Sequence, residues 1–282
     1  MPLVSLTPLL ARAEKEKRAV GAFNVSGIEM IYGVMRAAEE TGTPVVLQVA
    51  EKRLATTPLP VLGKAMIAAA ESSELPVAVH LDHGETEDCV RLALDLGFSS
   101  VMFDGSLLPT EESIRRTAAM AELAHRCGAT CEGEIGALGR SESGEERRAS
   151  YTDPEEALIF ARETGVDALA VAIGNAHGLY TGTPVFHFEV LDAIRAGSDI
   201  PLVLHGGTGS CEENFRRCIA SGVRKINIAT ALFRAAARAA REAEEEYFAM
   251  SRAVADAVYR TAEEHILLFN GGAAPRTKEA AG

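Results

Sequence analysis

Three of the seven histidines in this 282-residue chain stand where short apolar runs give way to polar loops. His83 follows "VAVHLD", His177 follows "ALAVAIGNA", and His205 follows "PLVL". Three imidazoles with one open coordination position are a typical ligand set of catalytic zinc. One such histidine alone is more often a hydrogen-bonded structural residue, but three in corresponding positions predict a metal site.

Carboxylates also stand at or near the ends of these apolar runs. Asp82 directly precedes His83 and is predicted to act as a general acid/base, with direct metal ligation as the alternative. Asp104 and Glu134 end two further runs and could hold a second cation or orient the histidines through their ring N–H groups, of which the orienting role is favoured. Glu132 is in phase with Glu134, and its burial would require a partner.

The remaining histidines give weaker signals. His80 shares a strand face with Asp82 and could orient a ligand, but a satisfied core histidine is an equally good interpretation. His125, His187 and His265 fall in helical patterns and are assigned to the surface or to packing.

The elements that must position these residues recur along the chain. Eight short runs of β-branched and aliphatic residues alternate with amphipathic helical patterns, which is typical of βα units around a parallel sheet. Eight such units in 282 residues predict an α/β fold, a single (β/α)8 TIM barrel, with a doubly wound open sheet as the alternative. The runs cover residues 19–25, 44–50, 76–82, 99–105, 130–136, 168–174, 201–207 and 225–230.

Additional helices are expected outside the repeat. A helix at about 3–17 should close the barrel bottom, and 232–270 should form C-terminal helices, with 1–282 as one domain. Asp153 followed by Pro154 predicts a helix start. The segment "ALGRSESGEERRASY", 137–151, is long for a βα loop and is predicted to be disordered or an active-site lid.

Composition narrows the function classes. A net charge of −12 argues against nucleic-acid binding, so an anionic substrate would need a local positive site. No apolar run approaches the roughly 20 residues that span a bilayer, and the mixed charges of "MPLVSLTPLLARAEKEK" do not match a signal peptide. Five cysteines without CxxC spacing indicate reduced thiols. These features predict a cytoplasmic enzyme with no membrane partner.

Two turns into helices could bind phosphate. "HGGTGSCEENF", 205–215, is glycine-rich, and "NIATALF", 227–233, is polar. Backbone N–H groups at such turns form an anion site without Lys or Arg, and the last two loops of a barrel commonly bind phosphate. Gly178 in "AHGLY" could bring a third backbone segment close.

The chain resembles the zinc-dependent class II ketose-bisphosphate aldolases, the fructose- and tagatose-bisphosphate aldolase family, over roughly residues 5–270. The resemblance is carried, in this order, by "AFNV", "HLDHG", "MFDGS", "EGEIG", "GVDALAVAIGNAHGLY", "PLVLHGGTG" and "KINIAT". The blocks "HLDH" and "AVAIGNAHG" together are highly specific.

The resemblance implies a role for each matching residue. Zinc would be held by His83, His177 and His205, with Asp82 as the catalytic aspartate, while Asp104 and Glu134 match positions linked to an alternative or second metal site. A monovalent cation often accompanies the phosphate. The dihydroxyacetone phosphate site would comprise Asn24, Gly178, Gly206, Gly207, Thr208, Gly209, Asn227, Ala229 and Thr230.

The reaction implied is reversible, zinc-dependent cleavage of fructose 1,6-bisphosphate or tagatose 1,6-bisphosphate. The products would be dihydroxyacetone phosphate and an aldehyde such as glyceraldehyde 3-phosphate, which places the enzyme in carbohydrate metabolism and glycolysis. Relatives suggest a homodimer or homotetramer. The alternatives are an aldolase for another ketose phosphate and a non-catalytic sugar-phosphate-binding subunit of an aldolase complex.

Departures from the family pattern affect the lid and the aldehyde end. Many relatives have "GGxED" after the strand-five glutamate, so the proton-donating carboxylate here is assigned to Glu145 or Glu146. Arg140 and Arg276 are candidates for a second phosphate site. A Schiff-base aldolase is disfavoured because Lys225 lies at the wrong end of its strand, and a metal-dependent hydrolase because "GAFNV" lacks HxH.

Overall fold

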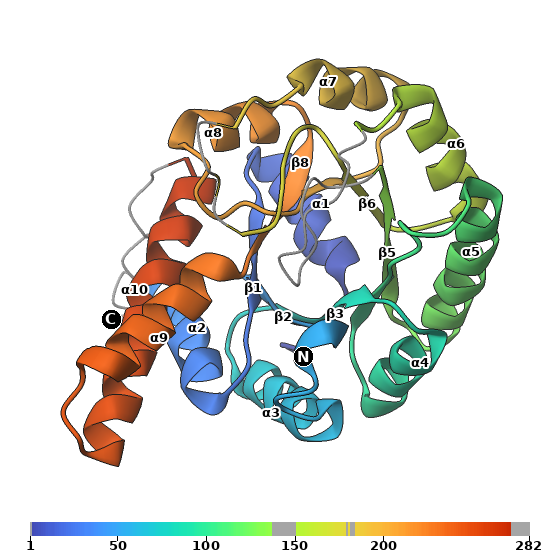
Figure 1. Cartoon of the computed structure of the whole chain (residues 1–282). Coiled ribbons are helices and arrows are strands. Elements are labelled where there is room, and N and C mark those ends of the chain that lie inside the picture. Colours follow the sequence, from blue (N-terminus) through green and yellow to red (C-terminus); the bar gives the residue numbers. More distant parts are fainter. Residues whose placement is uncertain (1, 137–150, 179, 181–183, 272–282) are drawn as a thin grey trace, which may run out of the picture.

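Eight parallel strands close in sequence order into a barrel in the computed structural model, which describes residues 2–136, 151–178, 180 and 184–271 (Figure 1). The predicted (β/α)8 barrel is confirmed, and the open-sheet alternative is wrong. The strands lie within about two residues of the predicted runs or inside them. They are β1 (Val20–Asn24), β2 (Val45–Ala50), β3 (Val77–Gly84), β4 (Ser100–Phe103), β5 (Thr130–Ile135), β6 (Ala168–Val171), β7 (Leu202–Leu204) and β8 (Val223–Ile228).

Helices surround the strands as a ring (Figure 1). Asp153 accepts hydrogen bonds from the N–H groups of Glu155 and Glu156, which confirms the predicted start of α6 at Pro154. The helices are α1 (Leu6–Glu16), α2 (Ile28–Thr41), α3 (Leu59–Ser72), α4 (Glu87–Leu96), α5 (Thr110–Arg126), α6 (Pro154–Thr164), α7 (Phe188–Gly197), α8 (Glu212–Ala220), α9 (Thr230–Glu242) and α10 (Tyr247–Phe269), with a short 3-10 turn, η1, at Glu51–Arg53.

The first helix closes the N-terminal end of the barrel. Leu6, Leu9 and Leu10 of α1 are buried against small and branched residues at the start of the strands, such as Val20 and Val46. The side chain of Thr130, the first residue of β5, accepts a hydrogen bond from the N–H of Leu6 at 3.2 Å. The predicted plug at the barrel bottom is therefore present.

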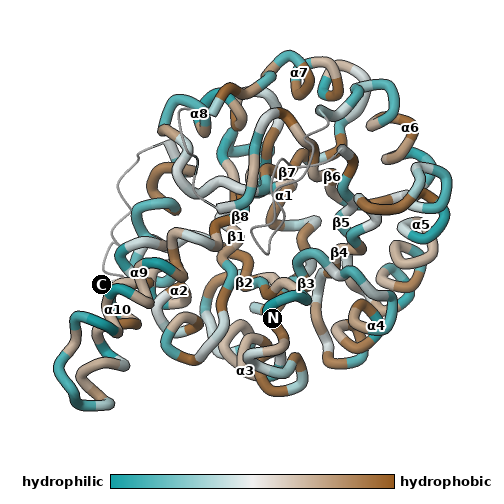
Figure 2. Tube along the Cα trace, viewed as in Figure 1, coloured by the Kyte–Doolittle hydropathy of each residue, from teal (hydrophilic) through white to brown (hydrophobic). Residues whose placement is uncertain are grey.

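A second apolar core lies between the strands and the outer helices. Every residue of β1, β2, β3 and β8 is buried, as expected for parallel strands that are covered on both faces. Helices α9 and α10 extend beyond the ring, and the turn that joins them is hydrophilic (Figures 1 and 2). None of the helices in the described part is both long and apolar enough to cross a bilayer.

Candidate active site

The three predicted metal ligands meet at the C-terminal mouth of the barrel. The ring centroid of His83 lies 4.9 Å from that of His177 and 4.7 Å from that of His205, and the other pair is 6.0 Å apart. One ring nitrogen of each residue lies within 4.8 Å of the others. All three side chains are buried, so the strand ends do bring together histidines that are distant in sequence.

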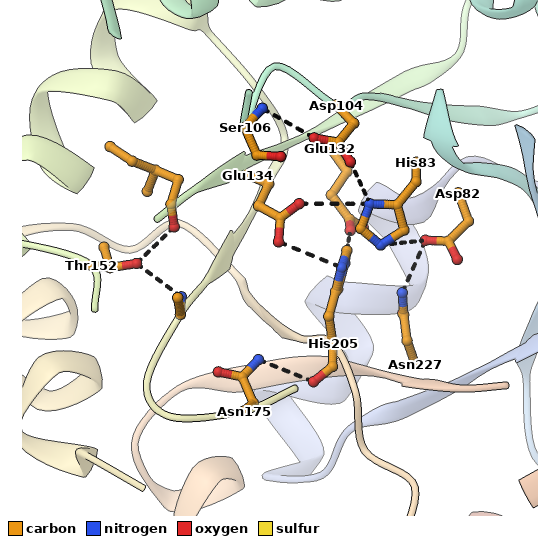
Figure 3. Close-up of polar contacts among 12 residues, drawn as sticks. Asp82, His83, Asp104, Ser106, Glu132, Glu134, Thr152, Asn175, His205 and Asn227 are labelled. Atoms are coloured by element: carbon orange, nitrogen blue, oxygen red, sulfur yellow. Dashed lines mark hydrogen bonds and ion pairs between the residues drawn. The ribbon is translucent and has the colours of Figure 1, made fainter. Parts of the chain in front are cut away.

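In two of these rings, one nitrogen contacts a carboxylate and the other nitrogen has no hydrogen-bond partner among the described residues. The Nδ1 atom of His83 is 2.8 Å from Oδ2 of Asp104, and the Nε2 atom of His205 is 2.8 Å from Oε1 of Glu132 (Figure 3). The opposite nitrogens, Nε2 of His83 and Nδ1 of His205, are buried and make no hydrogen bond with any described residue. A carboxylate behind an imidazole is the usual arrangement around a bound metal.

An irregularity in β3 turns Asp82 and His83 toward the same mouth. Consecutive strand residues normally point to opposite faces. Here the pairing of β3 with β4 shifts register between Leu81 and Gly84, and His83 has φ 44°, in the left-handed region. Non-glycine residues rarely adopt that region, and such strain is characteristic of functional sites. The period of the strand alone could not predict this bulge.

The surrounding carboxylates make the centre attractive to a cation. Burial would lower the pKa of His83, but the charge of Asp82 and the hydrogen bond with Asp104 raise it well above the usual value. Burial raises the pKa of Glu134 to about 8, and the charge of the His83 imidazolium opposes that shift. Burial also acts against ionisation of Asp104, yet its hydrogen bonds with His83 and Ser106 lower its pKa. Asp104 and Glu134 could, with His83, form a second ligand group.

Asp82 is kept ionised by amide donors and nearby positive charge. Its Oδ2 accepts a hydrogen bond from Nδ2 of Asn24 at 2.8 Å, and its Oδ1 accepts one from Nδ2 of Asn227 at 3.1 Å. Burial would raise the pKa of this carboxyl, but the charges of His83 and Lys225 and the Asn24 amide hold it below its usual value. A buried, ionised carboxylate 3.9 Å from Nε2 of His83 is suited to accept a proton beside that centre.

A polar hollow adjoins Asp82 and His177. Seven of the nine predicted substrate-binding residues line it, whereas Gly207 and Gly209 do not. The N-terminus of α9 faces the hollow, and the first turn of that helix carries no acidic residue. The other expected helix, α8, has Glu212 and Glu213 in its first turn and does not line the hollow. The lining residues from the prediction are Asn24, Gly178, Gly206, Thr208, Asn227, Ala229 and Thr230.

Close backbone packing requires glycine in the loop after β7. Gly206 has φ 66°, and a Cβ there would lie 2.2 Å from the carbonyl oxygen of Ala176. Tyr180 links the same loops, because its hydroxyl donates to the carbonyl of Gly206 at 2.9 Å and accepts from the N–H of Ala176 at 3.2 Å. The loop that carries His177 is thereby fixed against the loop that follows His205.

Other predicted residues have simpler outcomes. Glu145, Glu146, Arg140 and Arg276 lie outside the described residues. His80 is buried, with Nδ1 2.7 Å from the hydroxyl of Ser100, below the three-histidine cluster. His125 lies in α5 and His265 in α10, as expected, but His187 precedes α7 instead of lying inside a helix.

Sequence reasoning missed the role of Lys225. The partner that Glu132 requires is this lysine as well as His205, since Lys225 Nζ lies 2.9 Å from Oε2 of Glu132. Lys225 and Asn227 are two residues apart on β8 and therefore lie on the same face of the strand. A lysine within the otherwise largely apolar segment "KINI" was the sequence feature that could have indicated a buried, paired cation.

The fold and this cluster define a (β/α)8 barrel with a candidate catalytic metal centre. The donor set suits a metal, since three imidazoles with carboxylates behind them converge and two nitrogens remain unbonded in the described structure. The family model "Fructose-bisphosphate aldolase class-II" matches residues 4–272. The chain belongs to this family, whose members are metal-dependent, and it is therefore an aldolase, a carbon–carbon lyase.

Individual relatives cover most of the chain. The crystal structure of the YdjI aldolase from Escherichia coli K12 superposes with a TM-score of 0.87 at 35% identity, covering 95% of this chain and 97% of that one. A fructose-bisphosphate aldolase from Geobacillus stearothermophilus is 40% identical, with 82% of each chain covered. A 6-phospho-5-dehydro-2-deoxy-D-gluconate aldolase from Shouchella clausii is 39% identical over 82% of this chain and 80% of its own length.

Proposed function

We propose that this chain catalyses the reversible, zinc-dependent aldol cleavage of a ketose bisphosphate, fructose 1,6-bisphosphate or tagatose 1,6-bisphosphate. The products would be dihydroxyacetone phosphate and an aldehyde such as glyceraldehyde 3-phosphate. The single observation that supports this proposal most is the convergence of three buried imidazoles beside an ionised aspartate, next to a polar hollow.

His83, His177 and His205 would hold the catalytic zinc. When bound, zinc supplies Lewis-acid chemistry, which polarises substrate oxygens and offsets negative charge as the carbon–carbon bond breaks. Burial lowers the pKa of His205 well below its usual value, and the charge of His83 lowers it further, so this imidazole is neutral and able to donate an electron pair. Asp104 and Glu134 would orient these rings, or would serve as ligands of a second divalent cation.

Asp82 would remove the proton from the C4 hydroxyl of the substrate. Loss of that proton lets the C4 oxygen become the aldehyde carbonyl, and the electron pair of the C3–C4 bond passes to C3 of the dihydroxyacetone phosphate half. The amides of Asn24 and Asn227 hold the carboxylate in place for this transfer. Glu145 or Glu146 is proposed to protonate C3 afterwards.

The phosphate of the dihydroxyacetone half would lie in the hollow at the N-terminus of α9. Backbone N–H groups there, with the helix dipole, can bind an anion without a lysine or arginine side chain. Close contact is favoured by Gly178 and Gly206, whose positive φ values of 87° and 66° bring backbone rather than side chain to the hollow. Gly207 and Gly209 would act indirectly, by shaping the loop, and a monovalent cation is proposed to accompany the phosphate.

The aldehyde half of the substrate distinguishes two candidate functions, cleavage of a ketose bisphosphate and cleavage of another ketose phosphate. Relatives about 40% identical are named for fructose bisphosphate, for 6-phospho-5-dehydro-2-deoxy-D-gluconate and for sulfofructosephosphate. Such variety among similar sequences supports, as the second candidate, cleavage of another ketose phosphate by the same centre. We also propose that the enzyme acts in the cytoplasm, in carbohydrate metabolism, as a single-domain homodimer or homotetramer.

Metal analysis combined with a cleavage panel tests this proposal. The purified chain would be assayed with the two ketose bisphosphates, 6-phospho-5-dehydro-2-deoxy-D-gluconate and sulfofructosephosphate, with and without a chelator. We expect about one tightly bound zinc per chain at a three-histidine site, dihydroxyacetone phosphate as a product, and loss of turnover with chelator that zinc restores. Cleavage that continues at full rate after complete metal removal would contradict the proposal.

A further inference from the structure

Lys225 is a fully buried cation that takes no direct part in the proposed mechanism. Its ammonium lies inside the barrel on β8, below the mouth, and contacts two different acceptors. One is Oε2 of Glu132 at 2.9 Å, and the other is Oδ1 of Asn227 at 2.8 Å. A buried ion pair is weak support for stability, because desolvation of both charges offsets their attraction. The presence of this pair therefore requires a reason other than packing.

The first contact supports a metal ligand. Glu132 places Oε1 2.8 Å from Nε2 of His205, so the carboxylate accepts a hydrogen bond from a protonated Nε2 and leaves Nδ1 of that ring free of a proton. Glu132 is completely buried, and a buried carboxylate is costly unless a charged partner lies beside it. Lys225 supplies that charge from the side away from the histidine.

The second contact orients the catalytic carboxylate. Since Oδ1 of Asn227 accepts from Lys225, the Nδ2 end of the same amide must face Asp82, to which it donates at 3.1 Å. Without the lysine, the amide loses one of the two hydrogen bonds that fix its position and is held by the Asp82 carboxylate alone. The Asn24 amide is fixed in the same way by Gln48, whose Nε2 donates to its Oδ1 at 2.8 Å.

We propose that Lys225 is a positioning residue that connects the two halves of the centre, holding His205 through Glu132 and Asp82 through Asn227. The catalytic part of this inference rests on the proposed aldol cleavage. The metal-binding part does not, because it concerns only the orientation of an imidazole.

Two variants and one control separate these effects. Lys225→Met removes the charge at similar length, and the double variant Lys225→Met/Glu132→Gln removes both charges of the pair. Lys64→Met, at an exposed position of α3, is the matched control. Each protein would be tested for zinc affinity by competition with a chromogenic chelator, for thermal midpoint without metal, and for kcat and KM of the cleaved ketose bisphosphate.

We expect Lys225→Met to bind zinc about 10- to 100-fold more weakly, the range typical for loss of a group behind a metal ligand. Its kcat at saturating zinc should fall at least about tenfold, with a smaller change in KM, because Asp82 is misoriented. The double variant should recover thermal midpoint and most of the zinc affinity, since the side-chain amide introduced by Glu132→Gln can still accept a hydrogen bond from His205. Its kcat should stay low, because Asn227 still lacks its donor.

Several results would overturn the inference. If a folded Lys225→Met protein keeps the wild-type zinc affinity and kcat, Lys225 positions neither His205 nor Asp82. If the double variant recovers kcat as well as stability, Lys225 serves only to neutralise the charge of Glu132. If Lys225→Met does not fold, the double variant decides the question. If the wild type cleaves none of the panel, the proposed function fails, while weaker zinc binding by Lys225→Met would still support the role of Lys225 in holding His205.

Discussion

The two ends of the barrel interior are equally buried but differ in chemistry. At the N-terminal end, Leu6, Leu9 and Leu10 of α1 pack into an apolar cluster. At the C-terminal end, His83 and His205 are no more than 5% exposed, yet they belong to a network of charges and hydrogen bonds. The same strands therefore serve a packed core at one end and a reactive centre at the other.

Because of this difference, the N-terminal end of the barrel contributes mainly to stability and the C-terminal end mainly to function. Removing apolar area at the N-terminal end costs free energy of folding and leaves a cavity. Polar groups at the C-terminal end stabilise the fold weakly, because their mutual attraction is offset by desolvation. Substitutions at the two ends should therefore affect different measurements, and each prediction below tests that separation.

The largest expected effect is on activity, from loss of a metal ligand. His83→Ala removes one of three imidazoles, and at least about a 10³-fold loss of turnover is expected, because the metal stabilises transition-state charge by several kcal/mol. Zinc content should fall with activity. His125→Ala, at an exposed position of α5, is the control. If the His83→Ala protein keeps its zinc and its full activity, the histidine cluster at the C-terminal end of the barrel is not the metal centre.

A smaller loss of activity is expected from the carboxylate. Asp82→Asn keeps the shape but removes the proton acceptor, so kcat should fall by about 10² to 10⁴-fold, the usual contribution of a positioned base. Unlike the histidine variant, this protein should keep its zinc, which metal analysis would establish. Loss of zinc from Asp82→Asn would instead favour direct metal ligation by this residue.

Sequence could predict the parts of this centre that follow from strand order, but not those that follow from local geometry. His83 and His205 lie at the ends of β3 and β7, His177 lies in the loop after β6, and closure of the barrel brings these three positions to one mouth. The shared direction of Asp82 and His83 depends on a register shift and a left-handed residue, which no periodic pattern encodes.

Ring orientation and charge pairing also required coordinates. For His83 and His205, the nitrogen that faces the centre is fixed by Asp104, which follows the neighbouring strand β4, and by Glu132 of β5. Lys225 lies at the wrong end of its strand for a nucleophile, but that position does not exclude a charge partner below the mouth. Contacts across the barrel interior are long-range in sequence, so one strand cannot reveal them.

At the opposite end of the barrel, a core substitution should affect stability alone. Leu10→Ala opens a cavity between α1 and the strands, and a loss of about 2 to 5 kcal/mol in the free energy of unfolding is expected. The kcat of the remaining folded protein should equal that of the wild type. Denaturant unfolding and steady-state kinetics on one preparation measure both, with exposed Val61→Ala as control. A large fall in kcat would mean that the two ends are coupled.

The smallest effect concerns an ion pair at the N-terminal end. Glu14 of α1 binds Arg224 at 2.6 Å and Arg195 at 3.0 Å. Burial would raise the pKa of Glu14, but hydrogen bonds with Lys17 and Arg224 and the arginine charges lower it to about 2. A lowered pKa stabilises the folded state above the ordinary glutamate value, about 4.3, and this contribution disappears as pH falls toward the folded-state value.

Glu14→Gln should therefore lower the free energy of unfolding by about 1 kcal/mol at pH 6, a modest value because the side chain is about a third exposed. The difference from wild type should shrink between about pH 4.5 and pH 2, where the wild-type carboxylate takes up its proton. Urea unfolding of metal-free protein at a series of pH values measures it, with exposed Glu39→Gln as the control. A difference that stays constant down to pH 2 would mean that packing of α1, and not its charge pairing with β8, carries the contribution of this residue.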